Sequence, residues 1–455
     1  MNILGKSLLD LKRLLQKNEL SGQELNTYFL KRIKKYNSGL NAYLTLSENS
    51  DGVLPLAVKD NYCTKGIRTT ASSKVLDNFI PPYESTVTSR LKEKNFHIIG
   101  KTNMDAWAHG SSTETSDYGP TKNPWDLQRV AGGSSGGSAA SVSSYLAPAA
   151  IGSETAGSIR GPAAWCGIVG LKPTYGRVSR YGVIAMGSTL DCPGPLTLNV
   201  ADSAYILSII AGHDPYDATS SEEKVPDYAK KMSEKKTYTI GIAEDYFDGV
   251  QSDVKNKVNQ MIKILEKMGH KTKKVRLLHP KFVISVYTII QRSEVSSNLS
   301  RYDGVRFGNS RKAFAPEAKR RIMLGTYTLS YGYYDAYYKK AQRVRTLIIE
   351  DFKNTFADCD IIIGPTMPST ALKLGEFAKH PFFGEITDVL TEPAAIAGIP
   401  AISLPVGLDS NFLPVGVQIM GKWFDEESIL NLAYQIERET DFFGVIKKGI
   451  AKYKA

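Results

Sequence analysis

Residues 132–160 read GGSSGGSAASVSSYLAPAAIGSETAGSIR and contain two loops rich in glycine and serine. The first loop is GGSSGGS at residues 132–138, and the second is GSETAGSIR at residues 152–160. Ser134 and Ser158 lie in these loops, and an apolar segment separates them. Such loops allow the backbone to approach a substrate closely. They also let successive N–H groups point at one spot and stabilise an oxyanion.

The pattern of the first loop leaves several interpretations open. A flexible linker is disfavoured because apolar segments follow it closely. A phosphate-binding loop would require the pattern GxxxxGK[ST], and no lysine follows the glycines. A helix that begins with a serine N-cap fits the pattern and is compatible with a catalytic serine. Two similar loops close together in the sequence favour catalysis over these alternatives.

A nucleophilic serine needs a base, and Lys59 is the strongest candidate. The six histidines are scattered and form no recognisable motif, although a spatial triad with one of them stays open. Lys59 follows the apolar run LPLAV at residues 54–58, which indicates a buried strand that ends at the lysine. Burial beside hydroxyl groups lowers the pKa of a lysine from its usual value of about 10.4. The alternative is a structural lysine paired with Asp60.

Length and composition indicate an ordinary globular protein of 455 residues with 42% hydrophobic residues. We expect one domain over residues 1–455, with a catalytic core at about 50–200 and a more variable region at about 215–320. No apolar window reaches the roughly 18 residues of a membrane span, and the N-terminus lacks the apolar region of a secretory signal. The leucine-rich segment at residues 8–15 is interpreted as a helix of the fold, with an organellar transit peptide as the alternative.

The net charge of +11 favours an acidic partner such as nucleic acid, with a solvated basic surface as the alternative. The four cysteines form no CxxC pair, which indicates free thiols in a reducing compartment. Neither the cysteines nor the histidines have the spacing of metal ligands, so no metal site is expected in this chain.

Strands and helices alternate along the chain, which predicts an α/β fold with a substantially parallel core. Helices are expected at residues 22–37, 87–94, 137–145, 254–265 and 341–352. Strands are expected at residues 54–58, 97–100, 149–151, 238–242 and 361–363, the last ending at Gly364-Pro365. Residues 108–138 are expected to form a long functional loop.

Three segments together resemble the amidase signature family: AVKDN at 57–61, GGSSGGS at 132–138 and GSETAGSIRGPAAWCGIVGLKPT at 152–174. The resemblance covers nearly the whole chain and implies a central mixed β-sheet covered by helices on both faces. It makes Lys59 the base, Ser134 a bridging serine that follows a cis peptide bond, and Ser158 the nucleophile. The resemblance assigns further positions: an oxyanion hole at the N–H groups of Thr155, Ala156, Gly157 and Ser158, and a structural segment at Asp191, Gly194 and Pro195.

Four further stretches resemble the A subunits of glutamyl-tRNA(Gln) amidotransferases: residues 110–114, 119–124, 172–182 and 332–342. This resemblance implies that free glutamine is the substrate and that Tyr287, Arg321 and Asp388 bind it. An arginine can hold the α-carboxylate bidentately, and an aspartate can accept hydrogen bonds from the α-ammonium group. The alternatives are a solvated helix face for Arg321 and a helix cap for Asp388.

The same resemblance implies the reaction and the partners. Ammonia from glutamine converts Glu-tRNA(Gln) to Gln-tRNA(Gln). The chain itself needs no cofactor, and a B-type partner subunit uses ATP and Mg²⁺. A small third subunit braces the pair, and Glu-tRNA(Gln) is bound mainly through the complex. Two alternative functions are a stand-alone amidase for another small amide and a catalytically silent scaffold, although the intact Lys59, Ser134 and Ser158 disfavour the scaffold.

Three features depart from the usual pattern of these A subunits. Ala156 stands where glycine is usual, Gly161 replaces a usual glutamine, and the stretch between Asn49 and Val53 is short. The short stretch and the basic pI suggest a divergent lineage located in the mitochondrial matrix, with the bacterial cytoplasm as the alternative.

Overall fold

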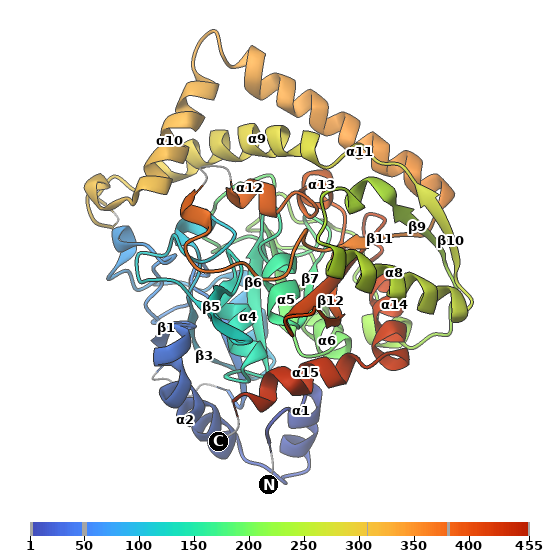
Figure 1. Cartoon of the computed structure of the whole chain (residues 1–455). Coiled ribbons are helices and arrows are strands. Elements are labelled where there is room, and N and C mark those ends of the chain that lie inside the picture. The colour runs from blue at the N-terminus through green and yellow to red at the C-terminus, as the bar shows by residue number, and fades with distance from the viewer. Residues whose placement is uncertain (1–2, 48–51, 307, 380–382, 454–455) are drawn as a thin grey trace.

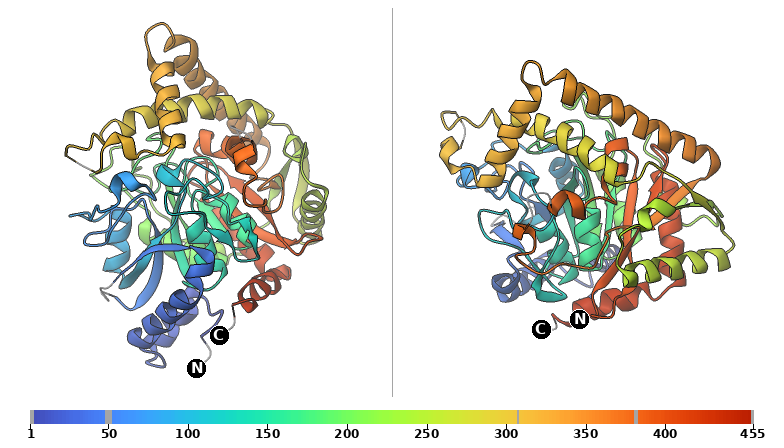
Figure 2. Two further views of the ribbon diagram at one scale, coloured as in Figure 1. Left: turned by 60° about the vertical axis from the view of Figure 1, so that its left-hand side comes forward. Right: turned by 45° about the horizontal axis from the view of Figure 1, so that its top comes forward.

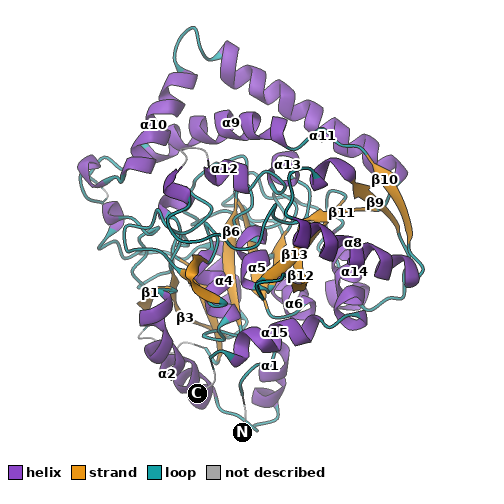
Figure 3. Cartoon of the chain, in the orientation of Figure 1, coloured by secondary structure: helices purple, strands orange, loops and turns teal. Residues whose placement is uncertain are grey.

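The computed structural model describes residues 3–47, 52–306, 308–379 and 383–453. One sheet of 11 strands crosses the molecule in the order β1-β3-β2-β6-β8-β7-β12-β13-β11-β9-β10 (Figure 1, Figure 3). Its strands are β1 (Tyr43–Leu46), β2 (Leu54–Lys59), β3 (Phe96–Thr102), β6 (Ala149–Glu154), β7 (Val169–Lys172), β8 (Cys192–Thr197), β9 (Thr239–Ala243), β10 (Lys271–Val275), β11 (Ile361–Pro365), β12 (Ala401–Leu408) and β13 (Pro414–Gly421). A separate pair is formed by β4 (Lys122–Asn123) and β5 (Asp126–Val130).

The described chain also contains helices throughout its length. They are α1 (Leu8–Gln16), α2 (Gly22–Leu40), α3 (Thr86–Glu93), α4 (Gly136–Ser143), α5 (Arg160–Cys166), α6 (Val200–Ile210), α7 (Tyr228–Met232), α8 (Ser252–Lys267), α9 (Lys281–Leu299), α10 (Pro316–Leu329), α11 (Lys340–Asp358), α12 (Phe383–Thr387), α13 (Glu392–Ala397), α14 (Glu426–Glu439) and α15 (Phe442–Ala451). No described helix combines the length and the apolar character that a membrane crossing requires.

Helices cover both faces of the sheet, as the family resemblance implied. On strand β13, a Cβ at Gly416 would meet Ala164 of α5, whereas a Cβ at Gly421 would meet Ile429 of α14. These two positions are five residues apart, and residues an odd number apart on a strand point to opposite faces. Helices α5 and α14 therefore pack on opposite sides of the sheet.

The sheet is mixed, so the expectation of a substantially parallel core is wrong. Strand β2 is parallel to β3 and β6, whereas β8 runs antiparallel to both β6 and β7, and β12 runs antiparallel to β7 and β13. The strands that the sequence pattern did not predict include β1 and β10 at the two edges of the sheet and four antiparallel strands in its interior, β7, β8, β12 and β13. All four contain glycine, and β8, β12 and β13 also contain proline, which weakens the sequence signal of a strand.

Most of the individually predicted elements are confirmed to within a few residues. Helix α1 belongs to the fold: Leu8 and Leu11 are buried, and the carboxylate of Asp202 accepts hydrogen bonds from the first N–H groups of the helix.

Two predictions need correction. The expected loop at 108–138 includes the β4–β5 pair and the start of α4, and β11 continues through Gly364-Pro365 because Pro365 pairs with Val417. The short stretch near Asn49 lies outside the described residues.

The register of the central strands brings two segments of the sequence to one edge of the sheet. Strands β2 and β6 are parallel neighbours, with Ala57 opposite Ala150 and Val58 opposite Ile151. Parallel neighbours end at the same edge, so Lys59 lies beside the carboxyl end of β6.

Helices α9, α10 and α11 lie together at the top of the molecule in Figure 1, with α12 and α13 beneath them, and Figure 2 shows the same layer from two other sides.

Candidate active site

The amine of Lys59 lies at the centre of the site and is completely buried. Its Nζ donates to Ser134 Oγ at 2.7 Å, to Ser153 O at 2.9 Å and to Ser153 Oγ at 3.1 Å. The alternative of a structural pair with Asp60 is wrong. The carboxylate of Asp60 accepts hydrogen bonds from Thr70 and Ser72, and no ion pair joins it to Lys59 in the described part of the chain.

Burial lowers the pKa of Lys59 to about 7, although the negative charges of Asp105, Asp191 and Glu154 oppose the shift. A substantial fraction of this amine is therefore neutral at neutral pH. Only the neutral amine can accept a proton, and its hydrogen bond to Ser134 Oγ gives it a direct path to a hydroxyl group.

Ser134 and Ser158 come from the two glycine- and serine-rich loops, and a backbone contact joins these loops. The Gly133–Ser134 peptide bond is cis, as the resemblance implied. The N–H of Ser135, the next residue, donates to the carbonyl oxygen of Ser158 at 3.2 Å. Among the described residues, no hydrogen bond joins the hydroxyl groups of Ser134 and Ser158, and no histidine hydrogen-bonds to either serine.

A buried ion pair closes the loop that carries Ser158. Glu154 at the end of β6 accepts hydrogen bonds from Ile159 N and Arg160 N, both at 3.0 Å, and from Arg160 Nε at 2.8 Å. The side chains of Glu154 and Arg160 have no exposed surface. Arg160 also donates to the carbonyl oxygens of Ala156 and Thr391, at 3.0 and 2.7 Å. These contacts fix the backbone between the two charged residues.

The fixed loop leaves backbone donors available. The N–H groups of Ala156, Gly157 and Ser158 donate to no acceptor in the described chain, so they can receive an oxyanion. The hydroxyl of Thr155 donates to Asp191 Oδ1 at 2.7 Å, which gives Asp191 a structural contact beside the loop. Ala156 is buried in an apolar cluster, so the fold accommodates the methyl group that replaces the usual glycine.

Gly157 sits where only glycine fits. A Cβ at this position would overlap Thr391 Oγ1 and would lie 2.8 Å from Asp388 Oδ1. The loop of Ser158 is therefore in direct contact with the segment that carries Asp388. At Gly161, where glutamine is usual, a Cβ would lie 3.2 Å from Met367 Sδ, so Met367 occupies the space beside this glycine.

Ser158 shares a small inner cavity with Tyr287 of α9, Arg321 of α10 and Asp388. The structure thus brings together four residues that are up to 230 positions apart in the sequence. The free volume of this cavity is about 10 Å³, which is the space of one water molecule. Glutamine can enter only when the side chains that line the cavity move.

Arg321 is buried, so its interpretation as part of a solvated helix face is wrong. Its Nε donates to Glu317 at 2.6 Å, and its Nη2 lies 3.7 Å from Glu385 Oε1. Glu385 also accepts a hydrogen bond from Arg292 Nη2 at 2.6 Å. Without substrate, the positive charge of Arg321 is therefore already compensated by two carboxylates of the protein, those of Glu317 and Glu385.

Asp388 is also buried, and its side chain does not cap a helix. Ser111 Oγ donates to Asp388 Oδ2 at 2.5 Å, whereas Oδ1 has no partner in the described chain. Burial raises the pKa of Asp388 to about 8, with an opposing contribution from Ser111. The unpartnered oxygen lies in the cavity wall and can accept a hydrogen bond from a cationic group.

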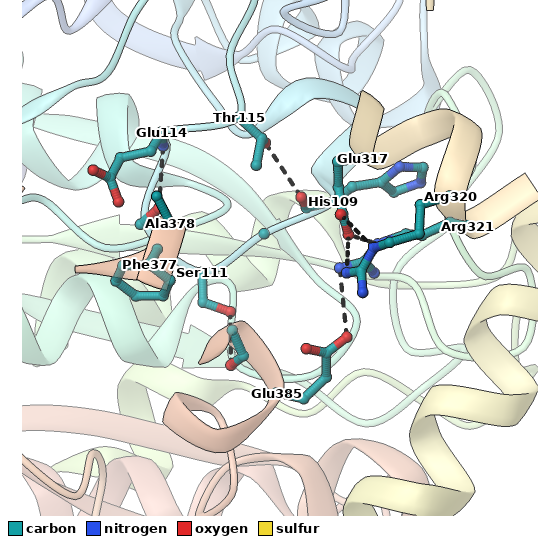
Figure 4. Close-up of a pocket in the computed structure, with 13 residues that line it drawn as sticks. His109, Ser111, Glu114, Thr115, Glu317, Arg320, Arg321, Phe377, Ala378 and Glu385 are labelled. Atoms are coloured by element: carbon teal, nitrogen blue, oxygen red, sulfur yellow. Dashed lines mark hydrogen bonds and ion pairs between the residues drawn. The ribbon is translucent and has the colours of Figure 1, made fainter. Parts of the chain in front are cut away.

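A larger outer cavity of about 380 Å³ adjoins the inner one (Figure 4). Ser111, Arg321 and Glu385 line both cavities, so these residues form the boundary between them. Figure 4 shows Arg321 between Glu317 and Glu385 at this boundary. A small polar molecule in the outer cavity is separated from Ser158 by these boundary residues.

Sequence reasoning missed several residues of the site. Ser153, Glu154 and Arg160 all lie inside the motif GSETAGSIR at residues 152–160. The opposite charges of Glu154 and Arg160, six positions apart, could have indicated an ion pair. Ser111 lies in a stretch that was singled out only for its resemblance to relatives. The contact between Glu385 and Arg321 spans 64 positions and leaves no signal in a single sequence.

Comparison with known proteins shows the family of this chain. The model of the family described as Amidase matches residues 24–430. The chain belongs to the amidase family. Among curated members of the amidase family, it is 50% identical to the A subunit of the glutamyl-tRNA(Gln) amidotransferase from Halothermothrix orenii, over 96% of this chain and 98% of that protein. It is 47% identical to the protein of the same name from Caldanaerobacter subterraneus, over 97% of this chain and 98% of that protein.

A solved structure of the amidase family supports the same grouping. The crystal structure of the A subunit of the glutamyl-tRNA(Gln) amidotransferase from Thermotoga maritima superposes with a TM-score of 0.84 at 40% sequence identity. The match covers 96% of this chain and 95% of that chain. Within the amidase family, the chain therefore groups with the amidotransferase A subunits, and the resemblance stated from the sequence is confirmed.

The buried ion pair gives a first prediction. Glu154→Gln keeps the size of the side chain but leaves the charge of Arg160 buried without a carboxylate. Loss of one partner of a buried pair costs about 3–5 kcal/mol, so the free energy of unfolding measured in urea should fall by that amount. The control is Glu244→Gln, which breaks the exposed pair with Lys274 and should cost less than about 1 kcal/mol. Equal losses in the two variants would contradict the structural role of Glu154.

Proposed function

We propose that this chain is the glutamine-hydrolysing A subunit of a glutamyl-tRNA(Gln) amidotransferase. It releases ammonia from glutamine, and the ammonia converts Glu-tRNA(Gln) to Gln-tRNA(Gln). The observation that carries the proposal is the inner cavity, where Ser158 faces Tyr287, Arg321 and Asp388. A cavity with a cation and an acid beside a nucleophilic hydroxyl suits a free amino acid. The full-length similarity to relatives of that name supports the same function.

Arg321 and Asp388 hold the two charged groups of the substrate. The α-carboxylate of glutamine binds Arg321 after the contact of this arginine with Glu385 gives way. The α-ammonium group binds Asp388 Oδ1, which has no partner in the described chain. Because the pKa of Asp388 is about 8 in the empty site, binding of the ammonium group favours its ionised form and releases a proton near neutral pH. The side-chain amide of glutamine then reaches Ser158.

The chemistry uses a relay of two serines and a lysine. Neutral Lys59 takes a proton from Ser134, which takes one from Ser158 as Ser158 Oγ attacks the amide carbon. The Ser134–Ser158 hydrogen bond forms in the substrate complex, because catalytic hydrogen bonds tighten when the substrate binds. The N–H groups of the loop at 155–158 stabilise the oxyanion. The tetrahedral intermediate then collapses, the relay returns the proton to the departing ammonia, and water hydrolyses the γ-glutamyl ester.

The partners follow from the same proposal. A B-type subunit uses ATP and Mg²⁺ to activate Glu-tRNA(Gln) and receives the ammonia, and a small third subunit completes a heterotrimer. This chain needs no cofactor of its own for the hydrolysis. Because the curated relatives come from bacteria, we place the complex in the bacterial cytoplasm rather than in the mitochondrial matrix.

The nucleophile gives the most specific chemical prediction. Ser158→Ala should abolish ammonia release from glutamine, because Ser158 supplies the hydroxyl group that attacks the amide. The other hydroxyl groups that line the inner cavity are those of Ser111 and Tyr287. Acid quenching of the wild-type complex should trap a γ-glutamyl ester on Ser158, identified by mass spectrometry of the peptide. Ser111→Ala is the control and should retain the trapped ester. Wild-type rates of ammonia release from Ser158→Ala would overturn the assignment.

Arg321 distinguishes a glutaminase from a general amidase. Loss of a charge-assisted hydrogen bond to a substrate costs about 1.5–3 kcal/mol, so Arg321→Leu should raise the KM for glutamine roughly tenfold to over a hundredfold. Propionamide has no α-carboxylate, and its hydrolysis should change little. Arg320→Leu is the control: it removes a neighbouring charge that lines only the outer cavity.

Circular dichroism of the assembled complex checks that both arginine variants are folded. An Arg321→Leu complex that hydrolyses glutamine with the wild-type KM would contradict glutamine binding by Arg321. A stand-alone amidase that acts on another small amide would then explain the site better.

A further inference from the structure

The buried carboxylate of Glu385 lies between two arginines of the substrate site. Its Oε1 accepts a hydrogen bond from Arg292 Nη2 at 2.6 Å and lies 3.7 Å from Arg321 Nη2. The side chains of all three residues are at most 6% exposed. Figure 4 shows Glu385 facing Arg321. A carboxylate of the protein therefore lies beside the guanidinium group to which we assign the α-carboxylate of glutamine.

Two carboxylates of the protein contact different parts of Arg321. Glu317, one turn earlier on α10, accepts a hydrogen bond from Arg321 Nε at 2.6 Å. Glu385 belongs to α12 and approaches Nη2 instead. The contact at Nε leaves the terminal N–H groups of the guanidinium for a bidentate contact with another carboxylate. Glu317 thus orients Arg321, whereas Glu385 lies at the terminal nitrogen atoms that a substrate carboxylate needs.

The two contacts of Glu385 differ in strength. The distance of 3.7 Å to Arg321 is too long for a hydrogen bond, whereas the contact of 2.6 Å with Arg292 is a charge-assisted hydrogen bond. Glu385 can therefore lose its contact with Arg321 and keep a cationic partner. Without Arg292 this loss would be unfavourable, because a buried charge that loses its partner is strongly destabilised.

The helices that carry the two arginines are packed directly on each other. Arg292 belongs to α9, which also carries Tyr287, and Arg321 belongs to α10. At Gly325 of α10, a Cβ would overlap the carbonyl oxygen of Arg292. The side chain of Glu385 comes from a different helix, so one carboxylate can replace another at Arg321 without separation of α9 and α10.

The pair of Arg321 and Glu385 spans the boundary between the inner and the outer cavity. Among the residues that line both cavities, these two are the charged ones. A ligand with a carboxylate can replace Glu385 at Arg321 and compensate the charge of the arginine. An uncharged amide offers no charge in exchange. The pair therefore favours amino acids over simple amides.

We propose that Glu385 competes with the substrate carboxylate for Arg321, and that Arg292 retains Glu385 when the substrate displaces it. This inference rests on the proposed function, because it extends the assignment of Arg321 as the carboxylate site. The apparent affinity for a ligand falls with the fraction of the protein in which the site is available. Glu385 thus weakens the binding of glutamine and of the product glutamate alike, and so it favours release of the product.

Glu385→Gln in the assembled complex gives the main test. This variant keeps the size of the side chain and an acceptor for Arg292 but removes the competing charge. It should lower the KM for glutamine and the inhibition constant of glutamate by about tenfold each. The KM for propionamide, which has no carboxylate, should not change. Glu376→Gln is the control: it breaks the ion pair with Lys379 and should leave all three constants unchanged.

Glu317→Gln separates competition from net charge. It removes the same charge from the same guanidinium group, but it should raise the KM for glutamine, because Glu317 orients Arg321. Equal decreases of the KM in Glu317→Gln and Glu385→Gln would reduce the effect to net charge and overturn the role of Glu385 as a competitor.

Arg292→Gln tests the second part of the proposal. It should raise the KM for glutamine, because Arg321 then becomes the remaining ion-pair partner of Glu385 in the described chain. The double variant Arg292→Gln/Glu385→Gln should return the KM to the wild-type value or below it, so the two effects are not additive.

The outcomes distinguish this inference from the proposed function. A folded Glu385→Gln complex with an unchanged or raised KM for glutamine would overturn the inference alone. If circular dichroism shows that this variant is unfolded, the double variant decides, and a KM above the wild-type value would overturn the inference. A wild-type complex that neither hydrolyses glutamine nor binds glutamate would overturn both the inference and the proposed function.

Discussion

The burial of one amine, that of Lys59, is the constraint on which the rest of the site depends. A lysine at the surface would be protonated at neutral pH and could not act as a base. Strand β2 ends at Lys59 between β3 and β6, in the interior of the sheet, where the side chain has no exposed surface. Desolvation there favours the neutral amine, in which two N–H groups can donate to Ser153 O and Ser153 Oγ while the lone pair accepts from Ser134 Oγ. The same burial gives the amine the neutral form that the proposed relay requires.

Other parts of the fold position the groups that act with this amine. The parallel register of β2 and β6 brings the loop of Ser158 to the same edge, and the Glu154–Arg160 pair fixes the backbone of that loop. Helices α9, α10 and α12 and the Asp388 segment close the site from the other side. The loops of the proposed relay are thus built on the sheet, whereas the proposed glutamine contacts come mainly from the helical layer.

The sequence pattern predicts the burial of Lys59, and resemblance alone points to Tyr287, Arg321 and Asp388. The apolar run before Lys59 and the two loops are local patterns that favour a buried lysine and a catalytic serine, whereas the separate roles of Ser134 and Ser158 come from the resemblance. Tyr287, Arg321 and Asp388 lie on ordinary helical or polar segments, and only the fold brings them to one cavity. The mixed sheet was mispredicted because its antiparallel strands contain glycine and proline, as in CPGPLT at 192–197. Glu385 was missed because its contacts with Arg292 and Arg321 are long-range.

The most direct test of this account is the titration of Lys59 itself. The ¹⁵N chemical shift of its Nζ can be followed from pH 5 to pH 11 in protein labelled at the lysine side chains, with the signal assigned by its loss in Lys59→Met. The account predicts a midpoint near the pKa of about 7 that burial imposes, so that the amine is largely neutral at pH 8. An amine that stays protonated above pH 10 would contradict the proposal that Lys59 is the base for Ser134 and Ser158.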